Sequence, residues 1–422
     1  MSELQRVIAS CLSDYDPDAL SVEDAKSIIG GFLRPVAATE RVHVRSALGR
    51  VLAEDIAATI DVPAHDNSAM DGYAVRGADL PAAGSVRMKR IGEAFAGRAF
   101  DGGVGAMQCV RIMTGAVMPH GADTVVVQEV CRAEGDEVEV PCGTRTGENV
   151  RFAGEDLARG RTVLRAGQLV RPAELGMIAS MGYAEVAVRR RLRVAFFSTG
   201  DELASIGQPL GEGQVYDSNR YTLYGMLTRI GAEVIDLGVV RDDPVALEEA
   251  LASAAASADA VITTGGVSVG EADYIRALLG RLGEVVFWKI AMRPGRPMAF
   301  GRVKEAAFFG LPGNPVAVMV TFYEFVREAL LRISGRTDDV AVPLLRVPCT
   351  AALRKKPGRT EYQRAILSRG TDGSFSVRLT GQQGSGVLRS MSEANCFIVL
   401  EHERGSVNPG DMVSVQLFEG LL

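Results

Sequence analysis

Residues 261–274 read VITTGGVSVGEADY, a stretch that joins a predicted buried strand to the predicted opening of a helix. Gly265, Gly266 and Gly270 lie at the junction between the two. Glycine loses more conformational freedom on folding than any other residue, so a plain turn would be expected to use fewer of them. We therefore ask what this turn makes room for.

The region around the turn, from about residue 193 to residue 335, alternates short apolar runs with helical patterns. This alternation is typical of βαβ units and predicts a mostly parallel sheet. Asp217 or Ser218 is expected to cap one helix that stops at Gly231, and Asp243 to cap the next. The sequence therefore predicts an α/β fold for the centre of the chain.

Other parts of the chain have different periodicities. Residues 297–303 and 306–313 could pair as a hairpin, and residues 315–335 predict a long closing helix. Residues 41–190 are rich in short strands and predict an arm, whereas alternation of period two from about residue 341 predicts a small all-β domain. The predicted segments are 1–40 (helical, packing with the α/β domain), 41–60 with 157–191 (base of the arm), 61–156 (β-rich arm), 192–335 (α/β domain) and 336–422 (C-terminal β domain).

Composition excludes several classes of protein. The chain has 422 residues and a net charge of −6, which argues against nucleic acid or an acidic membrane as its main partner. Its six cysteines have neither the paired spacing of a zinc site nor the density of a disulfide scaffold, so we expect reduced thiols. The sequence contains no secretory signal and no apolar run of about 18 residues, and we expect a cytoplasmic protein.

Ligands of open α/β sheets bind beyond the carboxyl ends of the strands, where loops lead into helices. In this chain the loops expected there combine acidic, basic and glycine residues. They carry Asp201, Glu202, Asp242, Asp243, Glu271, Asp273, Lys289, Arg293 and Arg296, together with the glycine turn and an LPGNP loop at residues 311–315. The sequence thus predicts one edge of the sheet at which a single ligand could touch all of them.

Taken singly, each feature has an ordinary explanation. A glycine-rich turn can be structural, Asn314 and Pro315 can simply cap and begin a helix, and loop acids such as Asp242 are usually solvated or capping. The four histidines are scattered, so we expect no metal site among them. The coincidence of several such loops at one predicted edge nevertheless favours a ligand site.

The charges at this edge indicate the kind of ligand. Cationic side chains, glycine amides and a helix N-terminus together form a cradle suited to phosphate or another oxyanion. Glu202, Asp242 and Asp273 would repel that anion unless a hard cation lay between, and Mg²⁺ is the natural candidate. The predicted anion-binding residues are Gly265, Gly266, Ser268, Gly270, Lys289, Arg293 and Arg296.

Eight motifs occur in order over nearly the whole chain. They are DNSAMDGYAV (66–75), RIMTGA (111–116), GED (154–156), STGDEL (198–203), YDSNR (216–220), TTGGVSVGEADY (263–274), LPGNPV (311–316) and GQQGSG (381–386). In these motifs the chain resembles the molybdopterin molybdenumtransferase family of the MoeA type, which includes the E-domains of gephyrin-like proteins. The resemblance implies a MogA-like central domain, a β-rich arm and a barrel-like C-terminal domain. It also implies an enzyme that inserts molybdate into adenylylated molybdopterin and releases AMP with Mg²⁺ present.

The resemblance implies specific residues and partners. It places catalytic groups at Asp71, Thr114, Asp156, Glu202, Asp242 and Asp273, and binding groups at Lys289, Pro312, Pro315, Arg364 and Ser385. It further implies a homodimer in which the arm of one subunit reaches the sheet edge of the other, with a molybdopterin adenylyltransferase as a further partner.

The chain departs from the family pattern at several positions. Arg293 and Arg296 replace the lysines of a K-P-G-K-P motif, which keeps the charge but changes its geometry. Ala317 and His65 stand where relatives often carry serine and an aromatic residue, so the preference between molybdate and tungstate stays open. Two alternatives are an adenylyltransferase of the MogA type, which would not need the arm or the β tail, and a gephyrin-like scaffold, which usually carries a second domain and a long linker.

Overall fold

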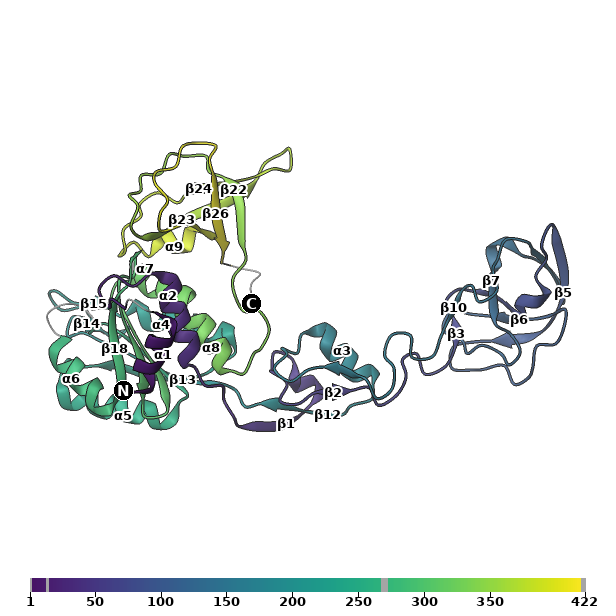
Figure 1. Cartoon of the computed structure of the whole chain (residues 1–422), viewed down its shortest axis with the longest axis horizontal. Coiled ribbons are helices and arrows are strands. Elements are labelled where there is room, and N and C mark those ends of the chain that lie inside the picture. The colour runs from purple at the N-terminus through teal and green to yellow at the C-terminus, as the bar shows by residue number, and fades with distance from the viewer. Residues whose placement is uncertain (1, 13–14, 267–271, 419–422) are drawn as a thin grey trace. The chain divides into compact units, whose positions relative to one another are not determined.

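The structure is a computed structural model that describes residues 2–12, 15–266 and 272–418, without the side chains of residues 272–275. Its contacts divide the chain into two compact units (Figure 1). The larger unit comprises Met1–Glu40, Gly49–Val51 and Arg189–Leu422, and the smaller unit comprises Arg41–Leu48 and Leu52–Val188. The finer division into five segments stays a prediction.

A six-stranded sheet forms the centre of the larger unit. Four neighbouring strands run parallel, as predicted. The predicted hairpin of residues 297–303 and 306–313 is also present, because the fifth strand pairs antiparallel with the fourth. The sixth strand pairs antiparallel with the fifth. In order across the sheet they are β16 (Glu233–Val240), β13 (Arg193–Thr199), β17 (Ala260–Thr264), β21 (Ala306–Leu311), β20 (Pro297–Val303) and β18 (Gly283–Lys289).

Helices cover both faces of this sheet. One face packs against α1 (Glu3–Cys11), α2 (Val22–Phe32), α4 (Ser218–Ile230), α7 (Pro315–Thr321) and α8 (Arg327–Ile333). The other face packs against α5 (Pro244–Ser257) and α6 (Ala272–Leu282). Because side chains alternate along a strand, Phe196 and Phe197 of β13 enter these two different clusters.

The helix termini confirm the predicted caps. The Asp217 side chain accepts a hydrogen bond from the amide of Arg220, and Gly231 ends α4 in the left-handed conformation. The Asp243 side chain accepts from the amides of Val245 and Ala246 at the start of α5. Each cap satisfies backbone groups that a helix end would otherwise leave without partners.

The closing helix is confirmed, but it is not uniform. A π-helical stretch, Phe322–Val326, lies between α7 and α8. Within it the buried carboxylate of Glu324 accepts hydrogen bonds from Lys26 Nζ at 2.9 Å and from Tyr362 Oη at 3.0 Å. The apolar period of the sequence did not reveal this stretch, because these partners lie 298 and 38 residues away along the chain.

The C-terminal β domain belongs to the larger unit. Its strands, in order, are β19 (Met292–Arg293), β23 (Thr360–Arg369), β25 (Cys396–Leu400), β26 (Met412–Leu417) and β22 (Leu344–Pro348), with β24 (Phe375–Leu379) on β23 and a short helix α9 (Arg389–Glu393). β19 follows β18 of the central sheet yet pairs in parallel with β23. This pairing and the Tyr362–Glu324 hydrogen bond join the domain to the α/β core.

The smaller unit is built mainly of strands, as the sequence predicts. Its six-stranded sheet has the order β7 (Thr124–Val127), β4 (Gly72–Val75), β6 (Gln108–Ile112), β5 (Ser85–Ala94), β9 (Glu137–Pro141) and β8 (Arg132–Glu134). The short pairs are β1 (Thr39–His43) with β12 (Glu185–Arg189), β2 (Ile56–Ala57) with β11 (Thr162–Leu164), and β3 (Asn67–Ser68) with β10 (Val150–Arg151). The helix α3 (Pro172–Ser180) and three 3₁₀ turns complete this unit.

Two further features bear on class. All six cysteines are free thiols. Over the part of the chain that the structure describes, no helix is both long and apolar enough to span a bilayer.

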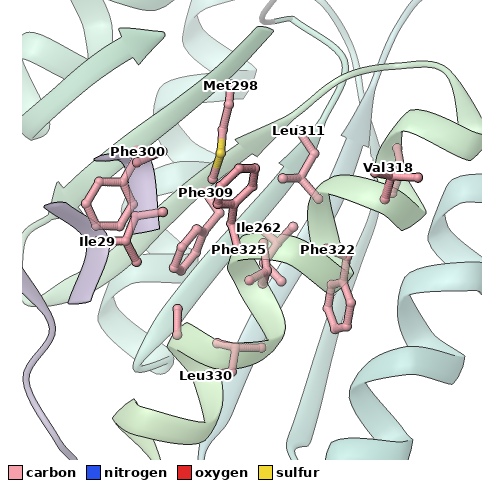
Figure 2. Packing of buried hydrophobic residues seen from close by; sticks show 14 of the residues in the cluster. Ile29, Ile262, Met298, Phe300, Phe309, Leu311, Val318, Phe322, Phe325 and Leu330 are labelled. Carbon is pink, nitrogen blue, oxygen red and sulfur yellow. The ribbon is translucent and has the colours of Figure 1, made fainter. Parts of the chain in front are cut away.

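The core of the larger unit depends on large side chains such as Phe309 of β21, which is fully buried in one cluster with Phe300 of β20 and Phe325 of the closing helix (Figure 2). Phe309→Ala is expected to lower the free energy of unfolding by about 3–5 kcal/mol, because it leaves a cavity in addition to losing apolar burial. Chemical denaturation measures this loss. Phe375→Ala, on an exposed side chain of β24, is the matched control and should change stability far less.

Candidate functional site

The topology brings the predicted loops to one edge of the central sheet, which we call the rim. β13, β16, β17 and β21 are parallel and end there. β18 runs in the same direction as β21, because each is antiparallel to β20, so β18 also ends at this edge and β20 begins there. The rim comprises residues 200–202, 241–243, 265–266, 289–297 and 312–315.

The glycine turn packs closely against a neighbouring strand. Gly265 has φ of +88°, and a Cβ atom built on it would lie 2.3 Å from the carbonyl oxygen of Thr199. Its amide donates to the carbonyl of Leu311 at 3.2 Å. The glycine therefore permits three strand ends to meet, which is one answer to what the turn makes room for. The predictions for Ser268, Gly270 and the Asp273 side chain lie outside the described residues.

Two of the predicted metal-binding carboxylates lie on the rim. Asp242 accepts a hydrogen bond from the hydroxyl of the buried Thr199, and Glu202 is exposed beside Gly200. Within the described residues, no group of three or more His, Cys, Asp or Glu side chains is arranged to hold a metal ion. Glu202 and Asp242 thus offer oxygen ligands but no closed coordination cage.

The predicted cations of the rim differ in their surroundings. Lys289 Nζ lies 2.8 Å from Asp18 Oδ1, a partner that the sequence did not predict. Arg293 and Arg296 are exposed, and neither forms an ion pair within the described part of the chain. The two arginines are therefore available to an anionic ligand.

Among the predicted binding residues, Arg364 is a buried cation, with only 1% of its surface exposed. Its Nε donates to Ser390 Oγ at 3.1 Å and its Nη2 to the carbonyl of Gly384 at 3.0 Å. A cavity of about 230 Å³ is lined by three arginines, Arg364, Arg293 and the exposed Arg354. Its lining also includes one carboxylate, the buried Glu361, which already pairs with Arg359 at 2.9 Å. Burial, and next the positive charge of Arg293, lower the pKa of Arg364 to about 10.

These features indicate that the cavity suits an anion. A buried charge is costly unless it is paired, and no carboxylate among the described residues forms an ion pair with the Arg364 guanidinium. Ser385 directly follows Gly384, whose carbonyl accepts from Arg364. The carbonyl of Ser385 accepts a hydrogen bond from the amide of Val316 at 3.1 Å. That contact holds the Ser385 loop against the first turn of α7, next to Pro315.

The remaining predicted catalytic residues lie in the smaller unit. Asp71 Oδ1 accepts hydrogen bonds from the amide of Thr114 at 2.7 Å and from its hydroxyl at 2.8 Å. Those two bonds lower the pKa of Asp71. Asp156 is exposed, and its amide donates to the carbonyl of Val62 at 3.1 Å. The structure therefore pairs Asp71 with Thr114, and it records no contact from the Asp156 side chain to either.

The chain is similar to known proteins over nearly its whole length. Three family models match successive parts of the chain: MoeA N-terminal region (domain I and II) over residues 20–182, probable molybdopterin binding domain over 195–332, and MoeA C-terminal region (domain IV) over 346–418. The chain belongs to the MoeA family. The expected family and fold class are thereby confirmed.

Individual relatives cover almost the whole chain. A molybdopterin molybdenumtransferase from Haemophilus influenzae is 43% identical over 91% of this chain and 95% of its own length. A protein of the same name from Nostoc is 37% identical over 94% of both chains. The crystal structure of a molybdopterin biosynthesis MoeA protein from Pyrococcus horikoshii, 28% identical, superposes with a TM-score of 0.83 over 95% of this chain and all of that one. These MoeA-family relatives do not favour the adenylyltransferase or scaffold alternatives.

Sequence reasoning missed four residues that contact the MoeA-family positions. Asp18 pairs with Lys289, Thr199 donates to Asp242, and Ser390 and Gln383 hold Arg364. Thr199 stands within the STGDEL motif, so its position after a buried strand was a usable signal. Gln383 likewise stands within the GQQGSG motif. Asp18 and Ser390 lie in none of the motifs, and their relation to the site arises from contacts at long sequence separation.

The close approach at the glycine turn yields a stability prediction. Gly265→Ala should lower the free energy of unfolding by at least about 1–2 kcal/mol, since a side chain disfavours the left-handed conformation and its Cβ would also clash with Thr199. The control is Gly280→Ala in α6, where a Cβ meets nothing within 4 Å. It should stabilise the protein by about 0.5–1 kcal/mol. Equal effects of both substitutions in denaturation would contradict the role given to Gly265.

Proposed function

We propose that this chain inserts molybdate into adenylylated molybdopterin, releases AMP and yields molybdenum cofactor. The observation that carries the proposal is the buried Arg364, which shares an anion-suited cavity with Arg293 of the rim. The names of the MoeA-family relatives supply the substrate and the reaction class. An arginine guanidinium presents several donors in a planar fork, which suits a tetrahedral oxyanion such as molybdate.

The rim and the neighbouring Arg364 cavity divide this work between two anions. Lys289, Arg293 and Arg296, with the amides of Gly265 and Gly266, bind the phosphates of the adenylylated pterin. Arg364 and Ser385 bind molybdate, and Pro312 and Pro315 shape the loop between the two sites. Cations placed around the bound substrate stabilise the charge that develops as AMP leaves.

The acidic residues of the rim are the proposed ligands of a magnesium ion. Glu202, Asp242 and Asp273 would hold the ion, which fits the preference of Mg²⁺ for one or two carboxylates together with substrate phosphates. When bound, the ion offsets negative charge on the phosphates. Thr199 keeps the Asp242 carboxylate oriented by its hydrogen bond.

The proposed role of the arm requires a second copy of the chain. Asp71, Thr114 and Asp156 belong to the smaller unit, whereas the rim belongs to the larger one. We propose a homodimer in which the arm of one copy completes the rim of the other, as the family resemblance implies, and a molybdopterin adenylyltransferase that supplies the substrate in the cytoplasm.

Molybdate-dependent release of AMP tests the reaction. Purified protein incubated with adenylylated molybdopterin and Mg²⁺ should release AMP faster when molybdate is present, because the oxyanion is a substrate of the same step. Chelation of Mg²⁺ should slow the release. AMP formation that ignores molybdate would disprove the proposed activity.

Arg364→Met tests the oxyanion site. Loss of a hydrogen-bonding charged partner should raise the molybdate concentration needed for half-maximal AMP release by about 10- to 100-fold. Arg378→Met, on the exposed face of β24, removes the same charge away from the cavity and is the control. A similar change in both variants would argue against a specific role for Arg364.

Mixing two inactive variants tests the shared site. Asp71→Asn removes the function of the arm and Arg364→Met that of the Arg364 cavity in the larger unit, so a mixed dimer would hold one intact site. Activity should reappear when the two proteins are unfolded and refolded together, and should not when they are refolded apart. Light scattering on the wild type checks the dimer directly.

A further inference from the structure

The first 19 residues lie outside the segments that the MoeA family models match, yet their described part is firmly packed. Leu4 and Ile8 of α1 are buried in the main core cluster. The amide of Leu4 donates to Glu284 Oε2 at 3.0 Å, and Glu3 Oε2 accepts from Arg302 at 2.9 Å. This N-terminal segment is therefore part of the α/β domain rather than a loose extension of it.

After α1 the chain follows the end of β18 toward the rim. Trp288 Nε1 donates to Tyr15 Oη at 2.9 Å, and the amide of Lys289 donates to the carbonyl of Pro17 at 2.7 Å. Leu20 then forms a parallel bridge with Ile290. Three successive residues at the end of β18 and just beyond it, Trp288 to Ile290, thus anchor the segment on both sides of Asp18. The backbone contacts at Pro17 and Leu20 set the position of Asp18 at the rim.

The Asp18 carboxylate lies among the cations of the rim. Its Oδ1 is 2.8 Å from Lys289 Nζ. The hydrogen bond and charge of Lys289 lower the pKa of Asp18, with smaller contributions from the charges of Arg276 and Arg296. The pair is open to solvent, with 43% of Lys289 and 67% of Asp18 exposed. An anion from solution can therefore reach Lys289, and it must compete with Asp18 to do so.

We propose that Asp18 is a specificity-determining residue, because its ion pair with Lys289 competes with a substrate phosphate for that cation. This inference rests on the proposed function, because it takes Lys289 as a phosphate-binding cation. A singly charged anion gains little binding free energy when it displaces a carboxylate that the backbone already holds at the rim. A phosphoanhydride carries several charges and contacts the neighbouring arginines as well, so it displaces Asp18 more readily. The N-terminal segment thereby selects for polyanionic ligands.

Asp18→Asn tests this competition directly. Calorimetric titration with inorganic pyrophosphate at low salt should show a dissociation constant about two- to fivefold lower than that of the wild type, as expected for an exposed ion pair. The gain should shrink as salt is raised, because salt screens exposed charges. A gain in affinity is informative because damage to the fold would lower affinity instead.

Two further variants sharpen the test. Glu23→Gln removes one negative charge from an exposed position in the first turn of α2, and pyrophosphate should bind it as it binds the wild type. In a Lys289→Ala background, Asp18→Asn should produce no further gain, because the cation for which it competes is gone.

The outcomes separate this inference from the proposed function. The role of Asp18 would be overturned if Asp18→Asn bound pyrophosphate no more tightly than the wild type, or if Glu23→Gln gained as much affinity. Molybdate-dependent AMP release by the wild type would still support the proposed function in that case. A wild type that neither binds pyrophosphate nor releases AMP would overturn both.

Discussion

The meeting of parallel strand ends at one edge of the central sheet is the constraint on which the site depends. β13 pairs with β16 and β17, and β17 pairs with β21, so each strand delivers its following loop to the same edge. Gly265 lets these ends approach to a distance at which any side chain would clash. In the proposed function, this approach brings the acidic and basic residues of the rim to one ligand. The arrangement of the rim is thus a consequence of backbone pairing.

A buried hydrogen bond links the anion cavity to the helical layer. Tyr362 lines the cavity that contains Arg364, and its hydroxyl donates to Glu324 in the π-helical stretch. Burial raises the pKa of Tyr362 well above its usual value, and the Glu324 carboxylate adds to that effect. The phenol therefore stays protonated and remains a donor. Because unpaired buried polar groups are costly, this contact favours one position of β23 against the helix.

Under the proposed function, charge balance accounts for the mixture of acids and bases at the rim of this MoeA-family chain. Cations alone would bind many anions, whereas carboxylates restrict binding to ligands that bring a metal ion or several negative charges. Arg293 and Arg296 supply positive charge with planar donor geometry. Asp18 extends the same principle to a segment outside the family match.

The sequence alone determined the features that depend on neighbouring residues. The caps at Asp217 and Asp243, the hairpin and the parallel α/β core follow from local hydrogen bonding and from apolar periodicity, so they were predictable. Family motifs, rather than periodicity, pointed to Arg364 and Ser385. Only the tertiary structure decided that Arg364 is buried at a cavity, that Glu324 lies in a π-helical turn, and that Asp18 pairs with Lys289. Each of these depends on partners distant in the chain, and a local pattern carries no information about which distant groups folding will bring into contact.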